Sequence, residues 1–347
     1  MSSYITYQPT KVLTQRGIVE YNDLLPGDYV YEYGTSKRLE VQKVITPDHH
    51  IHNSIYRVIF TDGRVRYFQE NDMVFTGTSI VPIELVGRNP EIVNIKQHPL
   101  HYRHRGEKPL DPDAYLAGAF IMFGSYDDKY INLPAYMTGI NDVFAHKHSV
   151  EYADEPLTNN RVHFRYIGTD KPITWKKFFD CNKNYITTKD MRIPIIPDIY
   201  SRATYKNRIQ FVRGVFDAGY NKELFDDNTV GIVDKTDYRL IEFQRVLWSL
   251  GILSKVEFDP YIDPSNDNKY KLTIFGNEHG YPGFTYLLDS IEHLLDQDNK
   301  IIDYDNQFSV KVSSICRMNY YGYKKNLLLN KPNAIFLSDN FLPLVSM

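Results

Sequence analysis

Two short apolar segments share a helical pattern and carry a glycine at the same place. The first, residues 114–123, contains Gly118, and the second, residues 210–218, contains Gly214. Each segment is followed by runs with strand character, and the two lie about ninety residues apart, which is typical of an internal duplication. Glycine on an apolar helix face lets a second backbone come close. We therefore expect two similar units whose helices pack at Gly118 and Gly214.

Both ends of the chain have β character. Short β-branched or aromatic runs alternate there with turn residues such as Asp62-Gly63, and no helical period runs through them. The expected strands are Val12–Thr14, Tyr29–Tyr33, Leu39–Ile45, Tyr56–Phe60, Val65–Phe68, Val310–Ile315, Leu327–Leu329 and Ile335–Leu337.

The middle of the chain mixes helices and strands. Its expected strands are Tyr130–Leu133, Val230–Val233, Leu253–Phe258 and Lys271–Phe275, and its further helices are Tyr238–Leu250 and a segment near Phe284–Leu295. We expect an α+β protein with β modules at residues 1–85 and 308–347, a linker at 86–112, and a duplicated domain at 113–307. The repeats span about 113–200 and 208–307.

Composition excludes several classes of protein. The chain has 347 residues, a formal net charge of -3 and only two cysteines, Cys181 and Cys316. No apolar run reaches the roughly 18 residues of a membrane span, and residues 1–10 lack the pattern of a signal peptide. Two cysteines exclude a disulfide framework and a cysteine-based zinc site. We expect a protein of a reducing compartment with neither a membrane nor a small-molecule partner.

Three histidines, His98, His101 and His104, are spaced by three residues in the linker. In a helix they would lie near one face and could bind a metal. No acidic or cysteine ligand sits beside them, and Pro99 opposes a regular helix, which favours a solvated linker over a metal site.

Charge is divided unevenly along the duplicated domain. Residues 157–213 hold 12 Lys/Arg against 4 Asp/Glu, a net of +8, whereas residues 214–310 hold 8 against 18, a net of -10. Aromatic residues alternate with the basic ones, as on a phosphate-contacting surface. Alternatively, the basic half packs on the acidic half. The DNA-binding candidates are Arg165, Lys171, Lys176, Lys177, Lys183 and Arg192.

The two apolar segments resemble the LAGLIDADG signature of homing endonucleases. They read YLAGAFIMFG at residues 115–124 and FVRGVFDAGY at residues 211–220, and the flanking Arg192-Ile-Pro and residues 240–252 also resemble what surrounds the second motif in that family. The resemblance implies a duplicated αββαββα unit that cleaves double-stranded DNA.

Cleavage in that family, as the resemblance implies, uses an acidic residue at the end of each motif helix to hold divalent cations. These positions are Phe123 and Gly219 here, and neither side chain can ligate Mg²⁺. Asp217 remains at the earlier acidic position of the second motif, whereas Ile121 replaces it in the first. Asp127 and Asp128 offer a displaced ligand, although turn chemistry explains them more simply.

The chain ends resemble the splicing (Hint) domain of inteins, split here into residues 1–85 and 308–347. Residues 10–17, 23–28 and 63–76 resemble its N-terminal blocks, and residues 327–345 resemble its C-terminal block. The resemblance implies acyl transfer by a first Cys or Ser, a Thr-x-x-His pair and a terminal His-Asn.

The splicing positions carry other residues in this chain. They are Ile5 for the nucleophile, Gln69 and Asp72 for the Thr-x-x-His pair, Leu344 and Val345 for the His-Asn pair, and Ser346 for the downstream nucleophile. Ile and Val carry no nucleophile and Leu carries no proton, so splicing is not expected.

We therefore expect a free-standing protein derived from an intein-type homing endonuclease, without catalytic residues or cofactor. It would serve as a binding or structural component of a phage, in the host cytoplasm or the virion. Its partners would be proteins of an assembly or double-stranded DNA. The alternative is an active Mg²⁺-dependent DNA endonuclease that uses Asp217 with Asp127 or Asp128. A third hypothesis is self-cleavage at Ser346.

Overall fold

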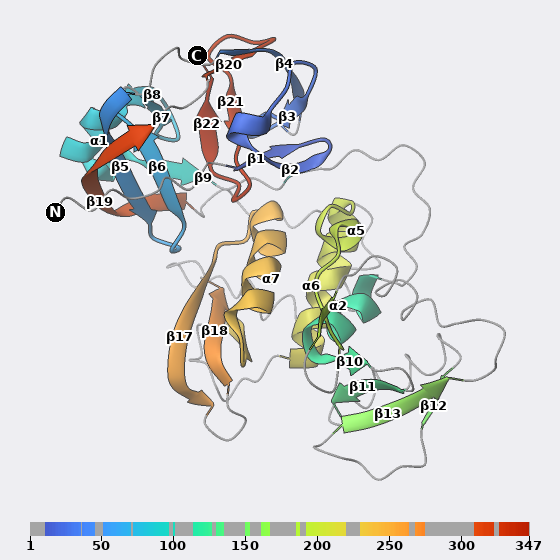
Figure 1. Cartoon of the computed structure of the whole chain (residues 1–347). Coiled ribbons are helices and arrows are strands. Elements are labelled where there is room, and N and C mark those ends of the chain that lie inside the picture. The colour runs from blue at the N-terminus through green and yellow to red at the C-terminus, as the bar shows by residue number, and fades with distance from the viewer. Residues whose placement is uncertain are drawn as a thin grey trace. The chain divides into compact units, whose positions relative to one another are not determined.

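The computed structural model describes most of both chain ends and the helices and sheets between them (Figure 1). The described residues are 11–35, 37–45, 51–70, 72–96, 100, 114–126, 130–134, 150–152, 161–166, 185–187, 192–219, 230–263, 268–274, 309–322 and 326–346. They form a mixed fold with mostly strands and few helices, which confirms the α+β class at that level.

The chain divides into two compact units. The end unit comprises residues 1–100, 251–253 and 302–347, and the central unit comprises residues 101–250 and 254–301. The end unit therefore combines segments from both chain ends.

One five-stranded sheet of the end unit has the order β2-β1-β3-β4-β20. Its strands are β1 (Lys11–Thr14), β2 (Gly17–Glu20), β3 (Tyr29–Tyr31), β4 (Arg38–Ile45) and β20 (Asn326–Leu329). Leu327 and Leu329 of β20 are buried with Val30, Leu39 and Val41 of the N-terminal strands. The C-terminal segment thus completes a core that the N-terminal segment begins.

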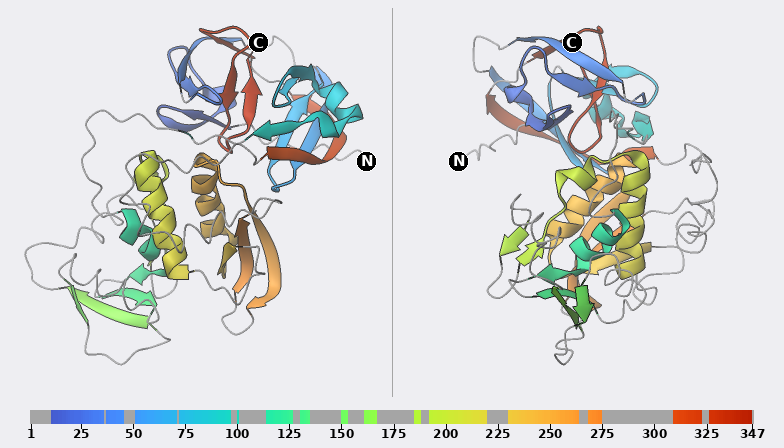
Figure 2. Two further views of the ribbon diagram at one scale, coloured as in Figure 1. Left: turned by 180° about the vertical axis from the view of Figure 1, so that it is seen from behind. Right: turned by 90° about the vertical axis from the view of Figure 1, so that its right-hand side faces the viewer.

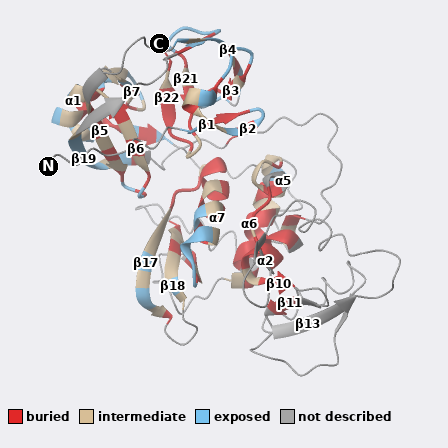
Figure 3. Cartoon of the chain, in the orientation of Figure 1, coloured by how far each residue is buried: buried red, intermediate tan, exposed pale blue. Residues whose placement is uncertain are grey.

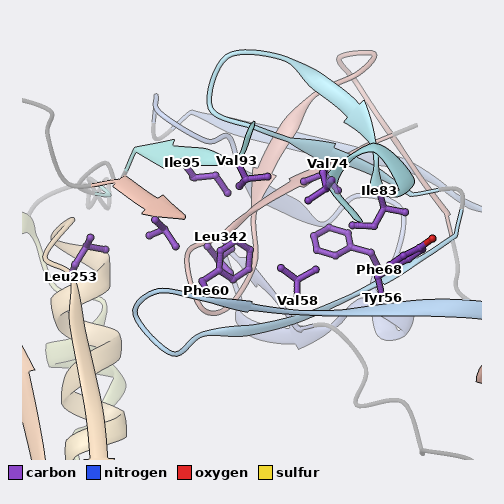
Figure 4. Close-up of a cluster of buried hydrophobic side chains, with 12 residues drawn as sticks. Tyr56, Val58, Phe60, Phe68, Val74, Ile83, Val93, Ile95, Leu253 and Leu342 are labelled. Atoms are coloured by element: carbon purple, nitrogen blue, oxygen red, sulfur yellow. The ribbon is translucent and has the colours of Figure 1, made fainter. Parts of the chain in front are cut away.

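The second sheet of the end unit repeats this combination in the order β6-β5-β19-β9. Its strands are β5 (Ile51–Phe60), β6 (Val65–Gln69), β9 (Asn94–Lys96) and β19 (Ser309–Gly322). Strand β19 is antiparallel to β5 from Val312↔Phe60 to Gly322↔Ile51. Val58, Phe60, Phe68 and Leu342 meet in the core of this half (Figure 4).

The end unit also contains several short helices and strands. They are η1 (Tyr21–Asp23), β7 (Met73–Phe75), β8 (Ile80–Pro82), α1 (Ile83–Arg88), η2 (Pro90–Ile92), β21 (Ile335–Leu337) and β22 (Pro343–Val345). The first part of the predicted linker 86–112 differs from expectation, because it lies in α1, η2 and β9. Val86, Val93 and Ile95 are buried there, so alternating apolar positions hold this polar stretch in the unit.

A buried ion pair ties the C-terminal segment to the turn between β5 and β6. Arg64 donates from Nε to Asp62 Oδ2 at 2.7 Å and from Nη1 to the carbonyl oxygen of Asn340 at 2.6 Å. Both charged side chains are at most 1% exposed. Burial lowers the pKa of Arg64, and the Asp62 carboxylate opposes that shift.

The first half of the central unit contains α2 (Ala114–Phe123) and a six-stranded sheet of order β12-β13-β11-β10-β15-β14. The strands are β10 (Ser125–Tyr126), β11 (Tyr130–Pro134), β12 (Val150–Tyr152), β13 (Arg161–Tyr166), β14 (Tyr185–Thr187) and β15 (Arg192–Pro194).

The second half places helices on one face of a three-stranded sheet of order β16-β18-β17 (Figure 2). Its elements are α5 (Asp198–Ser201), α6 (Tyr205–Gly219), β16 (Val230–Asp234), α7 (Asp237–Ser249), β17 (Ser254–Asp263) and β18 (Asn268–Ile274). Ile232, Leu272 and Ile274 are buried on the face toward the helices.

Most expected elements are confirmed within a few residues. The first motif helix has the predicted bounds, whereas α6 begins five residues before the predicted Gln210 and β19 continues to Gly322 rather than ending at Ile315. The helix predicted near Phe284–Leu295 lies outside the described residues. No helix in the part of the chain that the structure describes is long and apolar enough to cross a membrane.

We predict that Asp62→Asn destabilises the protein by about 3 kcal/mol, because removing one partner of a buried ion pair leaves the other charge uncompensated. The free energy of unfolding in urea measures the effect. Lys11→Gln is the matched control, because the Lys11–Glu20 pair at 3.5 Å is well exposed and its loss should cost less than about 1 kcal/mol. Equal losses in the two variants would contradict the role assigned to Asp62.

Candidate functional site

The two motif helices, α2 and α6, pack with their backbones in close approach at the two glycines. A Cβ added at Gly118 would lie 3.0 Å from the carbonyl carbon of Phe211 and closer still to its oxygen. A Cβ added at Gly214 would lie 2.7 Å from the carbonyl carbon of Tyr115, again closer to the oxygen. Ordinary carbon contacts lie at about 3.5–4.0 Å. No side chain larger than hydrogen fits at either position without moving a backbone.

Most described residues of α2, and most of α6 from Phe211 onward, are buried, whereas the start of α6 is partly exposed (Figure 3). Phe211 lies between Tyr200 and Phe243, with ring centroids at 5.6 and 6.4 Å. Phe216 contacts Phe243 at 5.7 Å. These rings pack α6 against α5 and α7, and between α2 and α6 the buried Ala119 and Ala218 pack together.

The ends of the two helices meet at Phe123 and Gly219. A Cβ added at Gly219 would lie 2.5 Å from Cε1 of the Phe123 ring and closer still to Cζ. Phe123 also packs against Ala119 and Ala218. The ring thus occupies the space that a side chain at residue 219 would need. The two positions that the motif resemblance assigns to metal ligands are in contact, and they meet through carbon.

The other predicted metal-ligand positions are either apolar or outside the described side chains. Ile121 is fully buried on α2. Asp217 lies on α6, and its side chain is outside the described part; Asp127 and Asp128 also fall outside it. Among the described residues, no three His, Cys, Asp or Glu side chains gather as a metal site would require. His98, His101 and His104 are outside the described residues.

Sequence reasoning missed a buried cation, Arg208 of α6. Its Nε donates to the carbonyl oxygen of Ala203 at 3.0 Å, and its Nη1 donates to that of Ser249 at 2.8 Å and to the Ser249 hydroxyl. Ser249 ends α7, so the guanidinium lies at the negative end of that helix dipole. The signal was available, since residue 208 precedes the buried Val212 and Val215 by four and seven positions.

The predicted basic surface is only partly described. Arg165 pairs with Tyr130 across β13 and β11, whereas Arg192 pairs with Tyr126, which itself pairs with Ile131. Directly opposed residues share a face of the sheet, whereas neighbours along a strand, such as Tyr130 and Ile131, lie on opposite faces. Position 165 shares the face of Tyr130 and position 192 shares the face of Ile131, so the two positions lie on opposite faces. The structure does not bring these two together. Lys171, Lys176, Lys177 and Lys183 lie outside the described residues.

Gln69 and Asp72, at the positions of the Thr-x-x-His pair, form a turn. The Gln69 N–H donates to Asp72 Oδ2 at 2.9 Å, and the Asp72 N–H donates back to the Gln69 carbonyl oxygen at 2.9 Å. The Ile83 N–H donates to the Asp72 carbonyl at 3.0 Å. These residues therefore join β6, β7 and the start of α1.

The C-terminal positions are also built into the fold. Val345 pairs with Ile335 in the β21–β22 hairpin. The next residue, Ser346, is 3% exposed, and its Oγ accepts a hydrogen bond from the Ala334 N–H at 2.8 Å. Its own N–H donates to the Ala334 carbonyl at 2.8 Å. Ile5, at the first nucleophile position, lies outside the described residues.

We predict that Gly118→Ala and Gly214→Ala each lower the free energy of unfolding by about 3 kcal/mol or prevent folding, because a methyl group forces the helix backbones apart. Gly87→Ala is the control. It lies in α1, where an added Cβ would lie 3.3 Å from one side-chain atom of Tyr56. Thermal unfolding followed by circular dichroism measures all three, and tolerance of both motif substitutions would contradict the close packing.

We also predict that the effects of Gly219→Ala and Phe123→Ala do not add. Gly219→Ala alone collides with the ring, whereas the double variant has room for the methyl group. A double-mutant cycle in urea should give a favourable coupling of about 1–2 kcal/mol. Additive effects within about 0.5 kcal/mol would show that the two positions are independent.

No family model matches the chain, and no curated protein matches it. Among solved structures, I-DmoI in complex with DNA and Mn is 15% identical, covering 54% of this chain and 97% of its own at a TM-score of 0.32. A mesophilic variant of the homing endonuclease I-DmoI is 14% identical, covering 54% and 96%, also at 0.32. The gp41-1 intein is 22% identical, covering 26% and 66% at 0.22.

Proposed function

We propose that this protein binds double-stranded DNA without cutting it, as a homing-endonuclease-type scaffold that has lost its catalytic residues. The contact between Phe123 and Gly219 carries the proposal. The motif resemblance assigns these two positions to metal ligands, and here a phenyl ring fills the space beside a residue with no side chain. A derivation from an element carried by a phage, and a role in a virion or assembly, belong to the same proposal and rest on the resemblance alone.

Phosphodiester hydrolysis by divalent cations needs oxygen ligands placed at the reacting phosphate. An aromatic ring supplies no such ligand, and its van der Waals contact with Ala119 and Ala218 favours the closed helix ends. Asp217 alone is one carboxylate on one helix, and a second would have to come from a different element. The helix pair is therefore proposed to act as a rigid scaffold and not as a metal-dependent nuclease site.

Loss of acyl transfer is part of the proposal. The two Thr-x-x-His positions serve a turn through Gln69 and Asp72, and the Ser346 hydroxyl is buried against the Ala334 N–H. A nucleophile held in this way is not directed at a neighbouring carbonyl carbon. This supports an end unit that keeps a stable fold without acyl-transfer chemistry.

Binding of DNA is supported by the basic character of the first repeat. Residues 157–213 carry a net charge of +8. Lysines and arginines concentrated in one segment suit a phosphate backbone, which they bind through charge and hydrogen bonds.

We predict that the protein retards a duplex pool of randomised sequence in a gel-shift assay, with affinity that falls steeply from about 50 to about 200 mM salt. Lys176→Glu/Lys177→Glu should weaken binding and flatten the salt dependence. Lys11→Glu/Lys37→Glu, in the end unit, changes net charge equally and is the control. Absence of retardation at low salt would refute DNA binding and favour a protein partner.

The same duplex pool, and a plasmid library of host and phage DNA, should remain intact with Mg²⁺ or Mn²⁺. Gel electrophoresis of the products measures this. Metal-dependent cutting that Asp217→Asn abolishes would overturn the non-cleaving function and establish the alternative nuclease.

A further inference from the structure

The second sheet of the central unit has one face away from its helices. The buried residues Ile232, Leu272 and Ile274 mark the face toward α6 and α7. Side chains alternate along a strand, so Lys255, Glu257 and Asp259 of β17 and Lys271 of β18 mark the other face. We name these four residues the paired-charge face.

Each lysine of the paired-charge face is held by a carboxylate of the same face. Lys255 Nζ lies 2.5 Å from Glu257 Oε1, and Lys271 Nζ lies 3.2 Å from Asp259 Oδ2. Glu257 is also directly opposite Lys271 in the strand register. The four side chains are between 27% and 39% exposed, so both ion pairs lie at the surface.

Asp259 is fixed from two sides. Besides Lys271, it accepts a hydrogen bond from the Tyr261 N–H at 3.2 Å. The Lys271 ammonium lowers the pKa of the Asp259 carboxyl, and the Tyr261 N–H acts in the same direction. Asp259 therefore stays charged at neutral pH and keeps its lysine engaged.

These ion pairs make the face unsuited to DNA. When a lysine binds a phosphate of DNA, counterions condensed on the DNA are released. Each such contact therefore makes the binding affinity depend more steeply on salt. Here the lysines at 255, 269 and 271 meet the two carboxylates Glu257 and Asp259 on the same strands, so the carboxylates reduce a charge of +3 on this face to +1. A phosphate approaching Lys255 or Lys271 would meet Glu257 or Asp259 at similar range, and like charges repel.

We propose that Glu257 and Asp259 act as a built-in restraint that keeps the second half of the central unit off duplex DNA, so that DNA is held by the first half alone. The inference rests on the proposed DNA binding and adds how that binding is limited. In this proposal the two carboxylates oppose DNA binding, and Lys255 and Lys271 make no contact with DNA in the wild-type complex.

The test compares DNA binding by three variants with the wild-type chain, using the same duplex pool and salt series. Glu257→Gln/Asp259→Asn releases both lysines and should bind about tenfold more tightly at about 50 mM salt, with a slope of log affinity on log salt steeper by about 1.8. Lys255→Gln/Lys271→Gln should leave wild-type binding within twofold. The quadruple variant should return to wild-type affinity, because the released lysines carry the gain.

Glu84→Gln/Glu91→Gln is the matched control, since it removes two negative charges from the end unit and should change binding less than threefold. Circular dichroism checks that every variant folds, which is expected because exposed ion pairs contribute little stability.

The outcomes separate this inference from the proposed function. If the wild-type protein binds and Glu257→Gln/Asp259→Asn binds no more tightly, the restraint is refuted while DNA binding stands. If Lys255→Gln/Lys271→Gln weakens wild-type binding, the lysines already contact phosphates and the restraint is again refuted. If only Glu257→Gln/Asp259→Asn binds, the restraint stands and the wild-type DNA-binding function falls. If neither binds, both are overturned.

Discussion

The close approach of α2 and α6 is the constraint on which the central unit depends. Each helix sets a glycine against a backbone carbonyl of the other, Gly118 at Phe211 and Gly214 at Tyr115, so the contact is reciprocal. At that distance there is no room to slide or rotate one helix on the other without collision. Tyr200, Phe216 and Phe243 then pack around a pair whose geometry is already set. The contact is reciprocal because a glycine stands at the matching position of each motif helix.

The end unit depends on a different constraint, the pairing of strands that are far apart in the chain. Strand β5 has β19 as a neighbour, and β4 has β20, so neither sheet is complete without the C-terminal segment. Such non-local pairing costs chain entropy before it is rewarded. The buried Arg64 helps to offset this entropy, because it binds Asp62 in its own turn and the Asn340 carbonyl oxygen in the returning C-terminal segment. One guanidinium thus fixes both a turn and the place where the distant chain returns.

Local signals predicted much of this fold. The bounds of α2 follow from an apolar run that ends at Gly124, and the terminal strands follow from β-branched runs between turn residues. Non-local features escaped prediction. The polar half of β19, beyond Ile315, is strand because β5 offers it partners. The early start of α6 has instead a local signal that was overlooked, Thr204, whose Oγ1 accepts a hydrogen bond from the Asn207 N–H at 3.4 Å. Phe123 and Gly219 were both singled out from the motifs, yet their contact is a property of two helices meeting and could not be seen in either motif alone.

Because of that contact, the residue that fits at position 219 depends on the residue at position 123. A carboxylate at residue 219 needs the space that the Phe123 ring occupies, so an aspartate there requires a smaller residue at 123. Conversely, an aspartate at 123 in place of the ring would leave Ala119 and Ala218 without their apolar neighbour and would set a charge beside a bare backbone. A carboxylate at 219 alone is therefore opposed by the collision with the ring, and one at 123 alone is opposed by the loss of apolar packing. The helix ends are held in their present apolar form by the same close packing that holds the helices together.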